Sequence, residues 1–99
     1  MYKQLFFLHK SENDQALSHF KESIIFHLSE LSGKKINLAK VESNLLLEQK
    51  YSYFCEIEFD SKDKMDELMS SKTGKQLSRA LMDFHKLITV ISINYDIKE

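Results

Sequence analysis

Hydrophobic residues along the chain fall into two kinds of pattern, and the first kind predicts strands. Leu5–Leu8 is a short apolar run, which indicates a strand buried on both faces. Residues 51–59 alternate instead, and one set of side chains is Tyr51, Tyr53, Cys55, Ile57 and Phe59. That period of two predicts a strand with one face directed toward a core. Two further strands are expected at Ile36–Val41 and Leu87–Ile93.

The second kind of pattern has helical spacing, and it first occurs between residues 11 and 33. The stripe on this predicted helix consists of Ala16, Leu17, Phe20, Ile24, His27, Leu28 and Leu31. We expect Ser11 to cap its N-terminus, where the negative charges of Glu12 and Asp14 are also favourable. Gly33 is expected to end it, because glycine adopts the left-handed conformation without a steric penalty.

A second helical stripe follows residue 60 and consists of Met65, Leu68, Met69, Leu77, Leu81 and Phe84. Asp60 or Ser61 is expected to cap it. Gly74 lies inside the stripe, shortly after Ser70 and Ser71, and we expect the helix to break or bend there.

The predicted order is strand, helix, strand, strand, helix, strand. Two right-handed crossovers of this kind interleave into one antiparallel sheet with both helices on one face. The expected fold is therefore an α+β, ferredoxin-like β-α-β-β-α-β domain, with the first and third of its four strands central. The 99 residues contain no proline and no linker-like stretch, so residues 1–99 are interpreted as a single domain.

The face of the sheet away from the helices is predicted to be apolar as well. Apolar side chains occupy both sides of Leu5–Leu8, and Ile88 and Val90 oppose Ile91 and Ile93 on the last strand. Two such sheets packed face to face about a two-fold axis would exclude water from this surface. We therefore expect a homodimer. Coverage by the chain's own tail is the alternative.

Charge and cysteine content narrow the classes of partner. The formal net charge is −1 and the basic residues are scattered, which argues against a nucleic-acid partner. Cys55 is the only cysteine, so no intramolecular disulfide can form. The apolar run at the N-terminus is too short for a signal peptide or a membrane span. These features predict a cytoplasmic protein without a membrane partner.

Several short motifs together resemble the EthD-like proteins of the dimeric α+β barrel superfamily. In chain order they are the strand start at Tyr2, Phe20 followed by His27, Gly33, Phe59-Asp60-Ser61, Ser71-Lys72-Thr73-Gly74 (similar to the family's Ser-Pro-Glu-Gly) and Asp83-Phe84. The chain departs from the family in having Glu22-Ser23 where a Tyr-Tyr pair usually precedes the histidine. The resemblance implies reductase-like, cofactor-independent chemistry on a small organic compound, without a metal or bound flavin.

His27 is the candidate catalytic residue, because a histidine within an apolar helical stripe needs a polar partner or a ligand. It is either a structural histidine or a general acid/base in an apolar cleft between helices and sheet. Phe20, Ile24 and Tyr53 are expected to line that cleft and bind the substrate. The sequence therefore predicts a small-molecule enzyme or, as the alternative, a non-catalytic dimeric ligand-binding or accessory protein.

Two histidines and the single cysteine are further candidates for metal binding or nucleophilic chemistry. His9 and His85 flank strands expected to be neighbours, yet no third metal ligand occurs at a suitable spacing, so no metal site is predicted. Cys55 has no predictable base beside it and is expected to be a core residue.

Overall fold

A computed structural model of the chain describes residues 1–13, 15–43, 46 and 50–95. Its elements are β1 (Tyr2–His9), α1 (Gln15–His19), the π-helical segment η1 (Phe20–Ile25), α2 (Phe26–Ser32), β2 (Ala39–Lys40), β3 (Tyr51–Phe59), α3 (Lys62–Met69), α4 (Lys72–Asp83) and β4 (Ile88–Asn94). The strands form one antiparallel sheet in the order β2-β3-β1-β4. The predicted α+β, ferredoxin-like arrangement, with β1 and β3 central, is confirmed.

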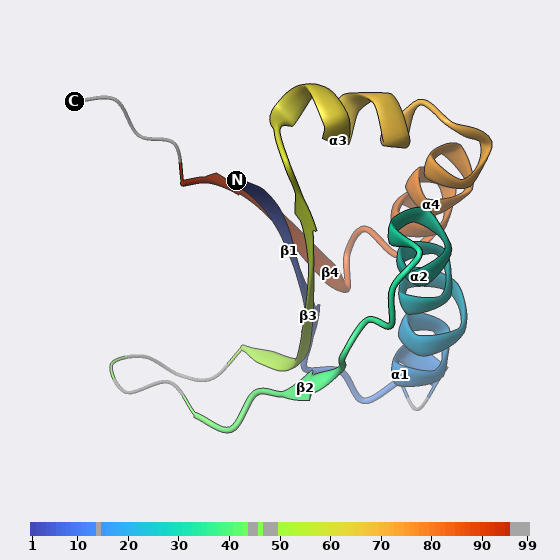
Figure 1. The fold of residues 1–99 in the computed structure, drawn as a ribbon. Helices are drawn as coiled ribbons and strands as arrows, with labels where there is room; N and C mark the ends of the chain where they lie inside the picture. The colour runs from blue at the N-terminus through green and yellow to red at the C-terminus, as the bar shows by residue number, and fades with distance from the viewer. Residues whose placement is uncertain (14, 44–45, 47–49, 96–99) are drawn as a thin grey trace.

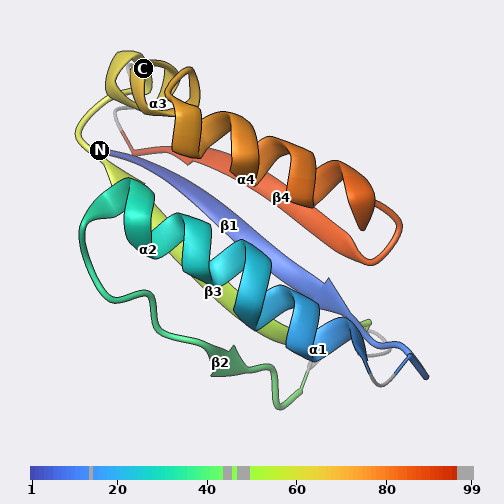
Figure 2. The same cartoon turned by 90° about the vertical axis from the view of Figure 1, so that its right-hand side faces the viewer.

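All described helices lie on one face of the sheet, and no described helix covers the other face, which we call the uncovered face (Figure 1). The helix of α1, η1 and α2 runs beside α4, and both lie along the direction of the strands (Figure 2). Between the two layers lies the core, whose largest fully buried side chains are Phe6, Phe20, Ile24, Leu28, Cys55 and Leu77. Burial of these apolar side chains is the main force that holds the helices on the sheet.

The first helix begins later than its sequence predicts. The Ser11 hydroxyl accepts a hydrogen bond from the backbone N–H of Asn13, and the Asn13 side chain then accepts one from the N–H of Gln15. Asn13 is therefore the capping residue in place of Ser11, which stabilises the turn before it. Asp14 lies outside the described residues. Gly33 ends the helix with φ 68°, as predicted.

The middle of this helix is π-helical over Phe20–Ile25. The wider turn keeps Phe20, Ile24 and Leu28, each four residues apart, in one fully buried row. His27 was expected within this row but is half-buried at its flank.

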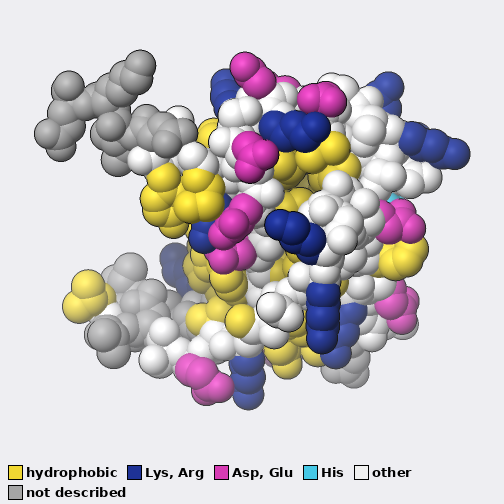
Figure 3. Space-filling model, viewed as in Figure 1, with side chains coloured by type: hydrophobic (Ala, Val, Ile, Leu, Met, Phe, Trp, Pro, Cys, Tyr) yellow, Lys and Arg dark blue, Asp and Glu magenta, His cyan; other side chains and the backbone are white. Residues whose placement is uncertain are grey.

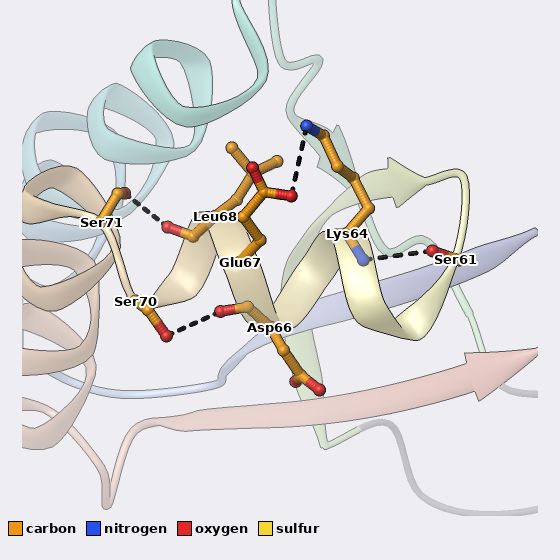
Figure 4. A network of polar contacts seen from close by, with 7 residues as sticks. All are labelled: Ser61, Lys64, Asp66, Glu67, Leu68, Ser70 and Ser71. Atoms are coloured by element: carbon orange, nitrogen blue, oxygen red, sulfur yellow. Dashed lines mark hydrogen bonds and ion pairs between the residues drawn. The ribbon is translucent and has the colours of Figure 1, made fainter.

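The second predicted helix breaks between α3 and α4. Ser61 caps α3 and Ser71 caps α4, and the hydroxyls of Ser70 and Ser71 donate to backbone carbonyls of the last turn of α3 (Figure 4). Gly74 lies against this corner, where an added Cβ would come within 2.5 Å of the Met69 Cα. A break is therefore confirmed, but it lies at Ser70 and Ser71 and not at Gly74, which is inside α4 and permits the close approach of the two helices.

The alternation of β3 is interrupted near its start. The register of β1 and β3 shifts between Leu8 and His9, so that Leu8 pairs with Tyr53 and His9 with Tyr51. Ser52 is the extra residue, and its hydroxyl donates to the Leu8 carbonyl at 3.2 Å. As a result Tyr51 points to the uncovered face, and the prediction that it shares a face with Tyr53 was wrong.

The outer strands differ in length from their predictions. The strand expected at Ile36–Val41 is reduced to Ala39–Lys40, because the side chains of Ile36 and Leu38 pack against the core while their backbone stays apart from β3. The last strand spans Ile88–Asn94, close to the predicted range.

Candidate functional site

The uncovered face of the sheet is the first candidate surface. Phe6 and Leu8 point to the helices, so their neighbours on β1 point away from them. Pairing with β1 assigns β3 and β4 residues to the same side, and the resulting open face carries Lys3, Leu5, Phe7, Tyr51, Phe54, Glu56, Glu58, Ile91 and Ile93. Hydrophobic side chains gather on this side of the molecule, at the left of Figure 3.

The centre of the open face is aromatic and its ends are polar. The Phe7 ring lies 4.8 Å from that of Tyr51 and 5.0 Å from that of Phe54, measured between centroids. At one end the Lys3 ammonium is 3.2 Å from Glu58 and 3.4 Å from Glu56, and hydrogen bonding to Glu58 raises the pKa of Lys3. An apolar centre with a polar rim is typical of protein–protein interfaces. The sequence predicts that β1 is buried on both faces. In the single chain, however, Leu5 and Phe7 are only half-buried.

The second candidate is a cleft of about 380 Å³ at the end of the central strands, which we call the strand-end cleft. Its lining residues are Leu8, His9, Lys10, Ser11, Asn13, Ala16, Leu17, Ser52 and Tyr53. Leu8 and Tyr53 are register partners on β1 and β3, and α1 supplies the opposite wall. The Tyr53 hydroxyl forms no hydrogen bond with the described residues, so a donor is available to a ligand.

Another cleft, of about 320 Å³, lies at the edge of β3, beside residues 32–39. Its charged lining residues are Lys34, Lys35, Glu56 and Glu58, so both signs of charge are present. This edge cleft exists because β2 pairs with only Tyr53 and Phe54, and the chain before β2 stands away from the rest of β3.

The four predicted site residues do not meet in one place. Phe20 and Ile24 are fully buried in the core, and Tyr53 packs partly against the same core while also lining the strand-end cleft. His27 lines neither cleft. Its Nδ1 lies 2.5 Å from the Ser23 carbonyl oxygen, one turn earlier, and its ring meets the edge of Phe26. A donated Nδ1–H leaves Nε2 as the ring atom available to another group.

The remaining candidate groups are separate from one another. His9 Nε2 lies 2.5 Å from the Thr89 hydroxyl, whereas His85 is exposed and its Nδ1 contacts the Met82 carbonyl. Among residues 1–13, 15–43, 46 and 50–95, no group of three potential ligands could hold a metal ion. Burial raises the pKa of the Cys55 thiol to about 12, which keeps it protonated and unreactive near neutral pH.

Sequence inspection missed Lys10, Ser11, Asn13 and Leu17 as cleft residues. The available signal was the cluster of turn-forming polar residues directly after a strand, because loops at strand ends frequently carry binding residues. Within the part of the chain that the structure describes, no helix is long and apolar enough to cross a membrane.

The fold and its uncovered sheet define the class of protein as ferredoxin-like α+β. An EthD family protein from Bacillus halodurans superposes with a TM-score of 0.78 at 21% identity, covering 95% of this chain and 97% of that one. A dimeric ferredoxin-like protein of unknown function from Jannaschia sp. gives a TM-score of 0.70 at 16% identity, covering 94% and 97%. Another from Thermobifida fusca gives 0.54 at 11% identity, covering 93% and 88%.

No protein-family model matches the chain, and no curated protein matches it. The structural neighbours confirm the fold that the EthD-like sequence motifs suggest, and two of them are described as dimeric. At these identities the likeness concerns the fold alone, and one fold supports many chemistries.

Proposed function

We propose that the protein is a homodimer of the EthD-like type that binds a small organic compound in the strand-end cleft. The observation that carries this proposal is the cleft itself. Its volume of about 380 Å³ is in the range of small-molecule sites, and it combines apolar side chains with the Tyr53 hydroxyl, which forms no hydrogen bond within the described part of the chain.

Self-association is supported by the open face of the sheet. Its aromatic centre of Phe7, Tyr51 and Phe54 would lose contact with water if a second copy packed against it. A two-fold axis makes one such patch complementary to itself. The dimeric state given for the Jannaschia and Thermobifida fusca proteins, which share the fold, supports the same arrangement.

A cofactor-independent enzyme with oxidoreductase-like chemistry is the second candidate. It is favoured by the similarity to an EthD family protein and by His27, whose Nε2 is the ring nitrogen not engaged with Ser23. In this version His27 acts as general acid or base on a substrate that binds beside its ring, outside the strand-end cleft, which His27 does not line. Binding without turnover distinguishes the first candidate from the second.

The cleft is tested by screening small neutral aromatic and aliphatic fragments against the ¹⁵N-labelled protein. We expect amide shifts at Leu8, Ser11, Leu17 and Ser52. The Leu17→Trp variant fills the cleft and should lose these shifts. Leu81→Trp is the matched control, because Leu81 is also half-buried on a helix but does not line the cleft.

Fragments that shift the edge-cleft residues 34–39 instead, or that still bind the Leu17→Trp variant at the strand ends, would contradict the proposed site. Native mass spectrometry of freshly purified protein is the companion measurement. A retained small molecule that the Leu17→Trp variant lacks supports the proposal.

A further inference from the structure

The formal charge on the described lining of the strand-end cleft is positive only. Lys10 is the only Lys, Arg, Asp or Glu among the described residues that line it. The edge cleft, by contrast, is lined by two lysines and two glutamates. A binding site whose only formal charge is positive favours an anionic ligand, because an ammonium group desolvated by a ligand needs a compensating negative charge.

Two further lysines, Lys40 and Lys50, lie at the same strand ends. Lys40 is the register partner of Tyr53 in the β2–β3 ladder, so its side chain leaves the sheet on the side of Tyr53. The backbone N–H of Lys10 donates to the carbonyl of Lys50 at 2.9 Å, which makes these two residues cross-strand neighbours. Within the described residues none of the three lysines forms an ion pair.

Two described glutamates lie near these lysines in sequence. Glu12 and Glu42 are both exposed, and neither lines the cleft. The cleft interior is therefore not neutralised by a described carboxylate.

The neutral polar groups of the cleft add hydrogen-bond donors. The Tyr53 hydroxyl has no partner among the described residues, and the Ser11 hydroxyl accepts from the N–H of Asn13 and so keeps its proton for another acceptor. Leu8 on β1 and the α1 residues Ala16 and Leu17 offer only hydrocarbon to the cleft. A cleft that combines hydrogen-bond donors and one cation with hydrocarbon matches an anionic head on an apolar body.

We propose that the strand-end cleft binds a small organic carboxylate, with the carboxylate at Lys10 and the Tyr53 hydroxyl and the apolar body against Leu8, Ala16 and Leu17. This inference rests on the proposed function, since it names the class of ligand for the same cleft. It adds a role for Lys10 that neither the fold nor the sequence motifs provide.

Benzoate and benzamide test the inference, because they have nearly the same shape and differ in charge. Both are titrated into the ¹⁵N-labelled wild-type protein, and amide shifts are followed at Leu8, Ser11, Leu17 and Ser52. We expect benzoate to bind about tenfold more tightly than benzamide, the difference that one charge-assisted hydrogen bond provides. The Lys10→Gln variant should bind both compounds with similar affinity.

Lys35→Gln is the matched control, because Lys35 is an equally exposed lysine that lines the edge cleft. It should leave the preference for benzoate unchanged. Equal affinity of the wild-type protein for the two compounds, or a preference that survives in Lys10→Gln, would overturn the carboxylate inference.

Absence of benzoate binding at the strand ends would also overturn it. The two proposals can fail separately, because the screen of neutral fragments with the Leu17→Trp variant tests whether the cleft binds small molecules, independently of any charge on the ligand. Neutral fragments bound in the cleft, together with no preference for benzoate, would retain the proposed function and remove only the ligand class.

Discussion

The rings of Phe7 and Tyr51 pack 4.8 Å apart on the sheet face that the helices leave uncovered. Their contact depends on the extra residue Ser52, which turns Tyr51 away from the side that Tyr53 occupies. The bulge thereby adds an aromatic ring to the open face and retains the other tyrosine at the strand-end cleft. This local irregularity of β3 thus places two tyrosines of one strand on the two surfaces proposed for dimerisation and for ligand binding.

Phe7→Glu is expected to weaken the dimer. A carboxylate at the aromatic centre would be desolvated in the interface and repelled by its symmetry mate, so we expect a dissociation constant about 30-fold higher. Light scattering coupled to size exclusion measures this over a concentration series. The control is Phe26→Glu, since Phe26 is 53% exposed on the helical side. A wild-type protein that is monomeric at micromolar concentration would contradict the proposed assembly.

His27→Ala separates the two candidate functions. If His27 is the general acid or base, turnover of the retained compound should fall by a factor of about 100 or more. Affinity for benzoate should stay unchanged, because His27 does not line the strand-end cleft. His85→Ala is the control, since His85 is exposed. Unchanged turnover in His27→Ala would remove His27 from the mechanism and leave ligand binding as the function.

Gly74→Ala is expected to destabilise the fold by about 3 kcal/mol, because the new methyl group would lie against backbone atoms that cannot move aside. The nearest include the Met69 Cα at 2.5 Å. Gly33→Ala meets open space and should lose only about 1 kcal/mol, from its left-handed backbone. Urea unfolding measures both. Equal losses would show that the corner between α3 and α4 relaxes.

The Cys55 thiol is expected to resist alkylation by iodoacetamide at pH 8 in the folded protein and to react quickly in urea. Its pKa is raised by burial from 9.0 to about 12, so the unfolded chain gains a thiolate at a lower pH than the native one. The protonated thiol therefore contributes to the free energy of unfolding in full below pH 9, and this contribution is lost as the pH rises toward 12. Rapid alkylation under native conditions would show that the core around β3 opens readily.

Several elements were predictable because they depend on neighbours in the chain. The stripe that includes Phe20, Ile24 and Leu28 identified the buried face of the first helix, and Gly33 its end. Ser61 was one of two caps proposed for α3, and it is the one that bonds to Lys64. The start of the first helix was not predictable in detail, because Ser11 and Asn13 can both cap and the choice depends on the course of the turn.

The candidate site was less predictable, for a physical reason. Helical spacing put His27 with Phe20 and Ile24, but the π-helical turn leaves it at the flank of their row. The strand-end cleft combines residues 8–17 with Ser52 and Tyr53, which meet only after β1 and β3 have paired. No local sequence pattern predicts that these residues lie side by side.

By itself the sequence determined the order of strands and helices and the apolar character of the helix-facing side of the sheet, because the period of hydrophobic residues is a local property of the chain. Only the tertiary structure decided which side chains share a cleft. The bulge at Ser52 and the short pairing of β2 result from competition between backbone hydrogen bonding and core packing, and that competition is resolved when all four strands are in register.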